Sequence, residues 1–91
     1  MSARAHIVVD GEALAGANFG IDVDATVSAF CQRVRRALAQ RFPELDVSAT
    51  PGPGNRVSVE CDDPDERARI AREIELVLYG VRKAADYIVY A

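Results

Sequence analysis

Two segments in the middle of the chain, residues 45–50 and 56–61, alternate apolar and polar positions, which is typical of strands with one buried face. The apolar positions are Leu45, Val47, Ala49, Val57, Val59 and Cys61. The stretch PGPGN between the segments consists of residues that favour turns. Together these features predict an antiparallel hairpin with one buried face and one solvated face.

The segment before this hairpin carries apolar residues at three- and four-residue steps, which predicts an amphipathic helix. Its apolar stripe consists of Val27, Phe30, Cys31, Val34, Leu38 and Phe42. Asp24 stands where a side chain can cap the first turn, and Pro43 is placed to end the helix.

A second amphipathic helix is predicted after the hairpin. Its stripe consists of Ile70, Ile74, Val77, Leu78 and Val81. The helix opens at DPDE, where Asp63 can accept hydrogen bonds from the first amides and Glu66 stands at the acidic position of a capping box. Asp65 and Arg69 have the spacing of an i,i+4 ion pair, and Gly80 is predicted to mark the end of the helix.

The N-terminal quarter of the chain has shorter patterns. Residues 6–9 are predicted to form a strand that ends at the Asp-Gly turn of residues 10 and 11. Residues 12–20 contain two glycines and are predicted to form a loop. Ile21 and Val23 alternate with polar residues, which predicts a second short strand.

The tail DYIVYA is aromatic and β-branched, so a final strand with two apolar faces is predicted there. The predicted class is therefore α+β: a small mixed sheet with two helices packed on one face, in the order β-(β)-α-β-β-α-β. A ferredoxin-like arrangement of the same elements is the alternative. Residues 1–91 are predicted to form a single domain, in which residues 1–24 extend a core of residues 25–91.

Composition narrows the class of protein further. An apolar share of 49% in 91 residues is enough for one hydrophobic core, and a net charge of -3 gives no global attraction to nucleic acid or to anionic lipid. The two cysteines have no CxxC spacing, which favours a reducing compartment. No export signal or membrane span is recognised, so we expect a cytoplasmic protein.

The segment from residue 27 to residue 90 resembles a BON domain, a small bacterial module of osmotic-stress and secretion proteins. Val57 and Val59 match the apolar pair of the family's second strand, the DER of residues 65–67 matches its helix start, and the Gly-Val of residues 80–81 matches the step before its last strand. Cys61 stands where the family places a glycine. The resemblance implies a small mixed sheet with two helices on one face, and a role in binding; the family's own role is in binding phospholipid.

Residue types that often carry chemistry have structural interpretations here. The acids of residues 60–66 are interpreted as a strand end followed by a helix cap, and His6 is interpreted as a strand residue. Cys31 and Cys61 are interpreted as small core residues, since neither has a base nearby in the sequence. The glycines match no phosphate-binding pattern. No catalytic residue, metal ligand or cofactor is predicted, and the protein is predicted not to be an enzyme.

Two surfaces are candidates for binding a partner. The first is the tail, through Tyr87, Ile88, Val89 and Tyr90, because a strand apolar on both faces either contacts a partner or is covered by the rest of the chain. The second is the outer side of the first long helix, which carries Arg33, Arg35, Arg36 and Arg41 and could contact an anionic partner.

These surfaces predict a small binding or assembly module that acts through protein–protein contacts, as a homo-oligomer or with a protein partner, in a bacterial cytoplasm. The alternative is a nucleic-acid-associated or regulatory protein that uses the arginines of the first long helix. Against base stacking, the polar face of the predicted hairpin carries no aromatic residue.

Overall fold

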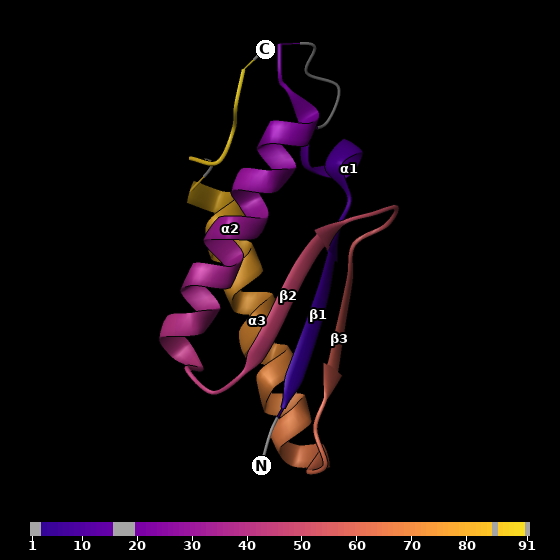
Figure 1. The fold of residues 1–91 in the computed structure, drawn as a ribbon, viewed down its shortest axis with the longest axis vertical. Helices are drawn as coiled ribbons and strands as arrows, with labels where there is room; N and C mark the ends of the chain where they lie inside the picture. The colour runs from indigo at the N-terminus through magenta and orange to yellow at the C-terminus, as the bar shows by residue number, and fades with distance from the viewer. Residues whose placement is uncertain (1–2, 16–19, 85, 91) are drawn as a thin grey trace.

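The computed structural model of the chain describes residues 3–15, 20–84 and 86–90. Its elements are β1 (Arg4–Val9), α1 (Gly11–Ala15), α2 (Val23–Arg41), β2 (Asp46–Pro51), β3 (Arg56–Glu60) and α3 (Pro64–Ala84). The three strands form one mixed sheet, beside which the two long helices run (Figure 1). The predicted α+β class with a small mixed sheet is confirmed.

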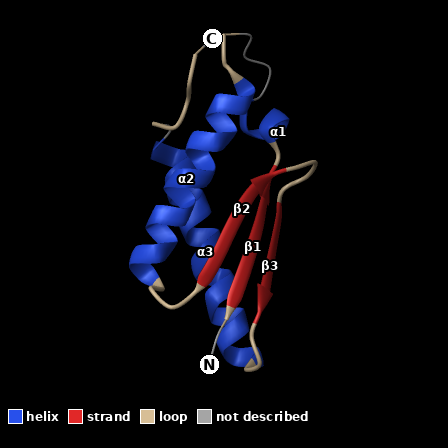
Figure 2. Cartoon of the chain, in the orientation of Figure 1, coloured by secondary structure: helices blue, strands red, loops and turns tan. Residues whose placement is uncertain are grey.

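The strand order is β2-β1-β3, with β1 parallel to β2 and antiparallel to β3. The predicted pairing of β2 with β3 as a hairpin is therefore wrong, because β1 lies between them (Figure 2). β1 is the strand with the most deeply buried side chains, since Ala5, Ile7 and Val9 are all almost fully enclosed. A central position lets both neighbouring strands and both long helices enclose these side chains.

The turn-rich loop between β2 and β3 passes across the end of β1 instead of closing a tight hairpin. The Gly52 N–H donates to the carbonyl oxygen of Val9 at 3.0 Å. The Asp10 carboxylate accepts from the Gly54 N–H at 2.9 Å, and the Asp10 N–H donates to the Asn55 side chain at 2.8 Å. Gly54 has a φ of 73°, a conformation that glycine adopts without strain. The turn residues thus allow the loop to pass over the end of β1 and connect β2 to β3 on its two sides.

The two faces of the sheet differ in the way that the alternating pattern predicts. The inner face contributes to one core, whose buried members are Ala5, Ile7, Val9, Val27, Phe30, Cys31, Val34, Leu38, Ala49, Ile70, Ile74 and Tyr87. The outer face is polar except for Val8, and its other members are Arg4, His6, Asp46, Ser48, Thr50, Arg56, Ser58 and Glu60. No aromatic side chain lies on these outer positions of the three strands.

Helix α2 begins earlier than predicted. Its N-cap is Asp22, whose carboxylate accepts from the Ala25 N–H at 3.1 Å, and Val23 is the first helical residue. Ile21 forms only an isolated bridge with Tyr90, so the predicted short strand of residues 21–23 is wrong. At the other end, the Phe42 N–H donates to the carbonyl oxygen of Leu38 directly before proline, as the helix stop predicted.

Part of the predicted N-terminal loop is the short helix α1. The Asp10 carboxylate accepts from the N–H groups of Glu12 and Ala13, at 3.0 and 3.3 Å, which satisfies free donors of its first turn. Of the rest of the predicted loop, residues 16–19, with Gly16, lie outside the described residues, and Gly20 lies in a turn.

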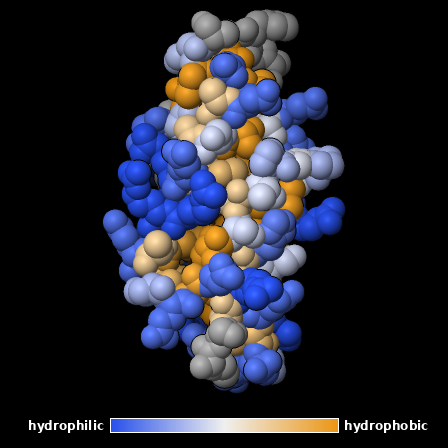
Figure 3. Space-filling view, viewed as in Figure 1, coloured by the Kyte–Doolittle hydropathy of each residue, from blue (hydrophilic) through white to orange (hydrophobic). Residues whose placement is uncertain are grey.

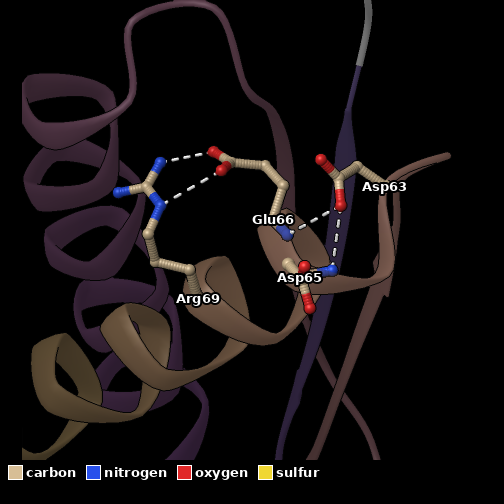
Figure 4. A network of polar contacts seen from close by, with 4 residues as sticks. All are labelled: Asp63, Asp65, Glu66 and Arg69. Atoms are coloured by element: carbon tan, nitrogen blue, oxygen red, sulfur yellow. Dashed lines mark hydrogen bonds and ion pairs between the residues drawn. The ribbon is translucent and has the colours of Figure 1, made fainter.

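Helix α3 begins as predicted and ends later. The Asp63 carboxylate accepts from the Asp65 and Glu66 N–H groups at 3.0 and 3.4 Å, which confirms the cap (Figure 4). The ion pair of Arg69 is with Glu66, not with Asp65, whose side chain points away from it (Figure 4). Gly80 lies inside the helix, which continues to Ala84, and Val81 directly after it packs partly buried against the core.

The tail after α3 is not a strand in its described residues. Residues 86–90 run beside the N-terminal half of α2, and Tyr90 forms only the isolated bridge to Ile21 (Figure 1). The predicted final strand is wrong, and the ferredoxin-like alternative, which includes that strand, is not observed. None of the helices in the described ranges is long and apolar enough to cross a membrane.

Candidate interaction surface

The four predicted interface residues of the tail have different environments. Tyr87 is buried, with 4% of its surface exposed, and its ring meets the Phe30 ring edge-on at a centroid distance of 4.9 Å. Ile88 packs partly buried against the core. Val89 and Tyr90 are exposed, at 37% and 68%. A surface available to a partner therefore exists only at the last two described residues of the tail.

The hydroxyl group of Thr26, a buried residue of α2, hydrogen-bonds to the backbone of the tail. Thr26 Oγ1 accepts from the Val89 N–H at 3.0 Å and donates to the Val89 carbonyl oxygen at 3.3 Å. The Asp22 N–H donates to the same carbonyl oxygen at 2.8 Å. The start of α2 thus satisfies the backbone of Val89, and this is the physical reason why the tail needs no place in the sheet.

The four arginines of the first long helix do not lie together. Arg33 forms an ion pair with Asp86 of the tail at 3.1 Å, and Arg41 pairs with Glu73 of α3. Arg36 lines the same shallow hollow as Arg33, whereas Arg35 lines a separate cleft on another side of α2. Hydrophilic residues gather over α2 in Figure 3. Their basic character is nevertheless reduced, because two of the arginines are already paired with acids.

The cleft that Arg35 lines lies at the carboxyl end of the parallel strands β1 and β2 and has a volume of about 730 Å³. One of its charged groups, the Asp10 carboxylate, is held by the N–H of Gly54 and by those of Ala13 and Glu12, which lower its pKa. Burial raises the pKa of the Cys31 thiol, which outweighs the opposite effect of Arg35. Asp10 is therefore used in holding the loops, and Cys31 stays a thiol, the weakly nucleophilic form.

The sheet brings together one pair that the sequence did not indicate. His6 Nδ1 lies 2.5 Å from Ser48 Oγ on the polar outer face, because the two residues are directly opposite in the β1–β2 register. A serine with a neighbouring imidazole is half of an acyl-transfer site. In the described part of the chain no carboxylate hydrogen-bonds to His6, and the pair lies on the polar sheet face that the helices leave uncovered.

No group of three or more metal-ligating side chains is assembled among the described residues. In the acidic stretch after β3, Asp63 caps α3 and Glu66 accepts from Arg69, whose hydrogen bond lowers the Glu66 pKa. Cys61 is a half-buried free thiol beside this cap. Asp63 has the capping role that the sequence predicted, whereas the prediction of Cys61 as a core residue is wrong, because it lies outside the buried core.

An apolar surface that the sequence did not indicate lies on α3. Leu76 and Tyr79 are 56% and 65% exposed and stand one helical turn apart. A hollow of about 360 Å³ beside Tyr79, between α3 and β3, is lined in part by Val57, Leu78 and Tyr79. We call Val57, Leu76, Leu78 and Tyr79 the α3–β3 surface. A helical wheel could have located Leu76 and Tyr79 outside the stripe of Ile70 and Ile74.

The outer edge of β3 borders this surface. β3 is an edge strand, and no other described element is drawn beyond it on that side of the molecule (Figure 1). Its five residues include no proline, whereas the opposite edge strand, β2, ends at Pro51. Because proline lacks an N–H, it blunts a strand edge against further pairing. β3 is the more open of the two edges.

Comparison with protein-family models and with curated proteins found no match to this chain. The resemblance of residues 27–90 to BON domains therefore stays a prediction.

Proposed function

We propose that this protein is a small non-enzymatic module that binds or assembles through protein–protein contacts. The observation that carries the proposal is the α3–β3 surface, where Leu76 and Tyr79 are exposed beside a hollow and an open strand edge. Exposed apolar groups that cluster, in contrast to single ones, are typical of contact sites. The free thiols of Cys31 and Cys61 agree with the reducing bacterial cytoplasm in which we place the protein.

The energetic argument concerns the side chains that stay in water. Complete burial of a leucine side chain is worth about 1.5–3 kcal/mol, and tyrosine is one of the residues most enriched at binding hot spots. Leu76 and Tyr79 realise little of this in the isolated chain because more than half of each is exposed. A protein partner that covers them would gain it, together with the hydrogen bonds of the strand edge.

The nucleic-acid alternative has less support. A phosphate-binding surface needs several unpaired cations close together. Here Arg33 and Arg41 are paired with acids, and Arg35 and Arg36 line different hollows. If it holds nonetheless, binding to DNA or RNA will weaken steeply with salt and with the double substitution Arg33→Glu and Arg36→Glu, as measured by fluorescence anisotropy.

The test of the proposed function compares the native chain with the double variant Leu76→Ser, Tyr79→Ser. Light scattering after size exclusion measures self-association, and affinity capture with each chain as bait measures retention of other proteins. We expect the native chain to form a larger particle, or to retain a protein, and the variant to lose that property. Circular dichroism checks that the variant is folded.

A matched control changes apolar residues that are exposed elsewhere. Val89→Ser with Tyr90→Ser removes comparable apolar area from the tail. We expect this control to behave as the native chain does. The proposal is wrong if native chain, variant and control are all monomeric and retain the same proteins.

A further inference from the structure

The edge strand β3 has a charge pattern that is complementary to itself. Its sequence is Arg56-Val57-Ser58-Val59-Glu60, with a cation at one end, an acid at the other and a serine in the middle. Neither Arg56 nor Glu60 takes part in an ion pair within the described residues, and Arg4, the neighbour of Glu60 on β1, pairs with Asp46 on the other side. Two opposite charges are thus left without partners on an open edge.

Antiparallel pairing of two copies of β3 about Ser58 would satisfy both charges. In that register Arg56 of each copy lies opposite Glu60 of the other, and Val57 lies opposite Val59. Residues directly opposite in an antiparallel pair point to the same face of the sheet. The two charge pairs therefore lie on the polar outer face, and the valines extend the apolar inner face.

We propose that the partner of this chain is a second copy, which pairs β3 with β3 antiparallel about Ser58 to give a continuous six-stranded sheet. This inference rests on the proposed function, because it names the partner for the α3–β3 surface. A two-fold axis through Ser58 preserves the helix-covered face, so the helices of both copies lie on the same side of the joined sheet.

The other edge of the sheet lacks these features. When two copies of β2 are paired in the same way about Ser48, Asp46 lies opposite Thr50, which gives no pair of opposite charges. Pro51 ends that strand without an N–H to donate. The charge pattern selects β3 and not β2 as the edge that pairs.

The hollow beside β3 matches the part of the second copy that would face it. Since Glu60 of the second copy lies opposite Arg56, its β3–α3 turn, with the acids Asp62 and Asp63, approaches the end of β3 where the hollow opens. Arg56 and Arg82 are the cations that line this hollow. Glu75 also lines the hollow, so its lining carries two cations and one acid. An acidic turn of one copy thus meets a net basic lining of the other, twice in the dimer.

A cysteine at the two-fold axis tests the register. In a Cys61→Ser background, which removes the neighbouring half-buried thiol, Ser58→Cys places two thiols on directly opposite residues of an antiparallel pair, within disulfide reach. The matched control is Thr50→Cys, which is exposed on β2. After mild oxidation, non-reducing electrophoresis should show a covalent dimer for Ser58→Cys and a monomer for Thr50→Cys.

Charge reversal tests the same register without a covalent cross-link. Arg56→Glu or Glu60→Arg alone puts like charges opposite each other at both ends of the pair, and each should raise the dimer dissociation constant by at least about tenfold. The double reversal Arg56→Glu, Glu60→Arg restores opposite charges and should return the dissociation constant to within about threefold of the native value. Sedimentation velocity over a range of concentrations measures all four chains.

The outcomes separate this inference from the proposed function. The β3 register is overturned if the native chain dimerises but Ser58→Cys does not cross-link. It is also overturned if the double reversal does not restore the dissociation constant that the single reversals raise. Either result leaves a protein-binding role standing. A monomeric native chain that retains a different protein through Leu76 and Tyr79 also overturns the dimer only. A monomeric chain that retains no protein overturns both.

Discussion

The second half of α3 and the tail that follows it are both apolar in sequence, yet the structure buries different parts of them. Tyr79 of α3 is 65% exposed, whereas Tyr87 of the tail is 4% exposed. The sequence predicts a contact surface in the tail and a core stripe in the helix. The difference shows that local apolarity does not decide burial; the geometry of the neighbouring element does.

The two tyrosines differ in what lies opposite them. The tail runs along α2, so the Tyr87 ring reaches the Phe30 ring, and Thr26 satisfies the backbone of Val89. On α3 the inward direction is taken by Ile70 and Ile74, which leaves Tyr79 on another side of the helix. A helix can bury only one stripe against a two-layer core.

The largest expected effect comes from truncating the buried tyrosine. Tyr87→Ala should lower the free energy of unfolding by about 3–5 kcal/mol, since it removes an aromatic ring from the core. Tyr79→Ala should change it by no more than about 0.5 kcal/mol in the monomer. Urea denaturation at low protein concentration measures both. Similar losses for the two variants would remove the contrast between the regions.

The attachment of the tail depends on the Thr26 hydroxyl. Thr26→Val should lower the free energy of unfolding by about 1–3 kcal/mol, because it leaves the part-buried N–H of Val89 without its acceptor. Hydrogen exchange at the Val89 amide should become faster, while amides in the middle of α3 keep their protection. Thr26→Ser retains the hydroxyl and serves as the control. Unchanged exchange at Val89 in Thr26→Val would contradict this attachment.

The continuation of α3 past Gly80 predicts a stabilising substitution. A Cβ at Gly80 would meet no other atom within 4 Å, and the residue lies inside a helix. Gly80→Ala should therefore raise the free energy of unfolding by about 0.5–1 kcal/mol. Thermal or urea unfolding measures the change. A loss of stability would mean that the helix ends at this glycine, as the sequence had suggested.

Tyr90 offers a direct comparison of the tail with the α3–β3 surface. If the α3–β3 surface is the contact, Tyr90→Asp should leave the dissociation constant of the dimer within about threefold of the native value, as rim positions do. Tyr79→Asp should raise it at least about tenfold in the same sedimentation experiment. The reverse ranking would return the contact to the tail.

Lowering the pH should reduce the free energy of unfolding without changing the contrast between the two regions. Hydrogen bonds lower the pKa of Asp10 and of Glu66 in the folded chain, and both carboxylates lie outside the two regions compared. A carboxylate with a lowered folded pKa contributes stability above its unfolded pKa of about 4, and this contribution is lost as the pH falls through the folded pKa. The free energy of unfolding should fall below about pH 4, less steeply in Asp10→Asn. The difference between Tyr87→Ala and Tyr79→Ala should stay the same.

The sequence by itself determined the local elements. The strands β1, β2 and β3, the two long helices, and the Asp63 cap follow from periodicity and capping, which act over a few residues. The boundaries that were wrong, at Asp22 and at Gly80, lie beside contacts with distant parts of the chain. The tail backbone accepts from Asp22, and Val81, directly after Gly80, packs against the core.

Only the tertiary structure decided which strands pair and which apolar residues stay in water. β2 and β3 have the alternation and the turn of a hairpin, but each pairs with β1 instead. The inner apolar side chains of β1 are the most deeply buried of the three strands, and a central strand is covered by a neighbour on each side. Which strands pair depends on contacts between residues that are distant in the chain. A local pattern of apolar and polar residues does not contain that information. For the same reason Tyr87 could not be assigned to the core before the course of the tail along α2 was known.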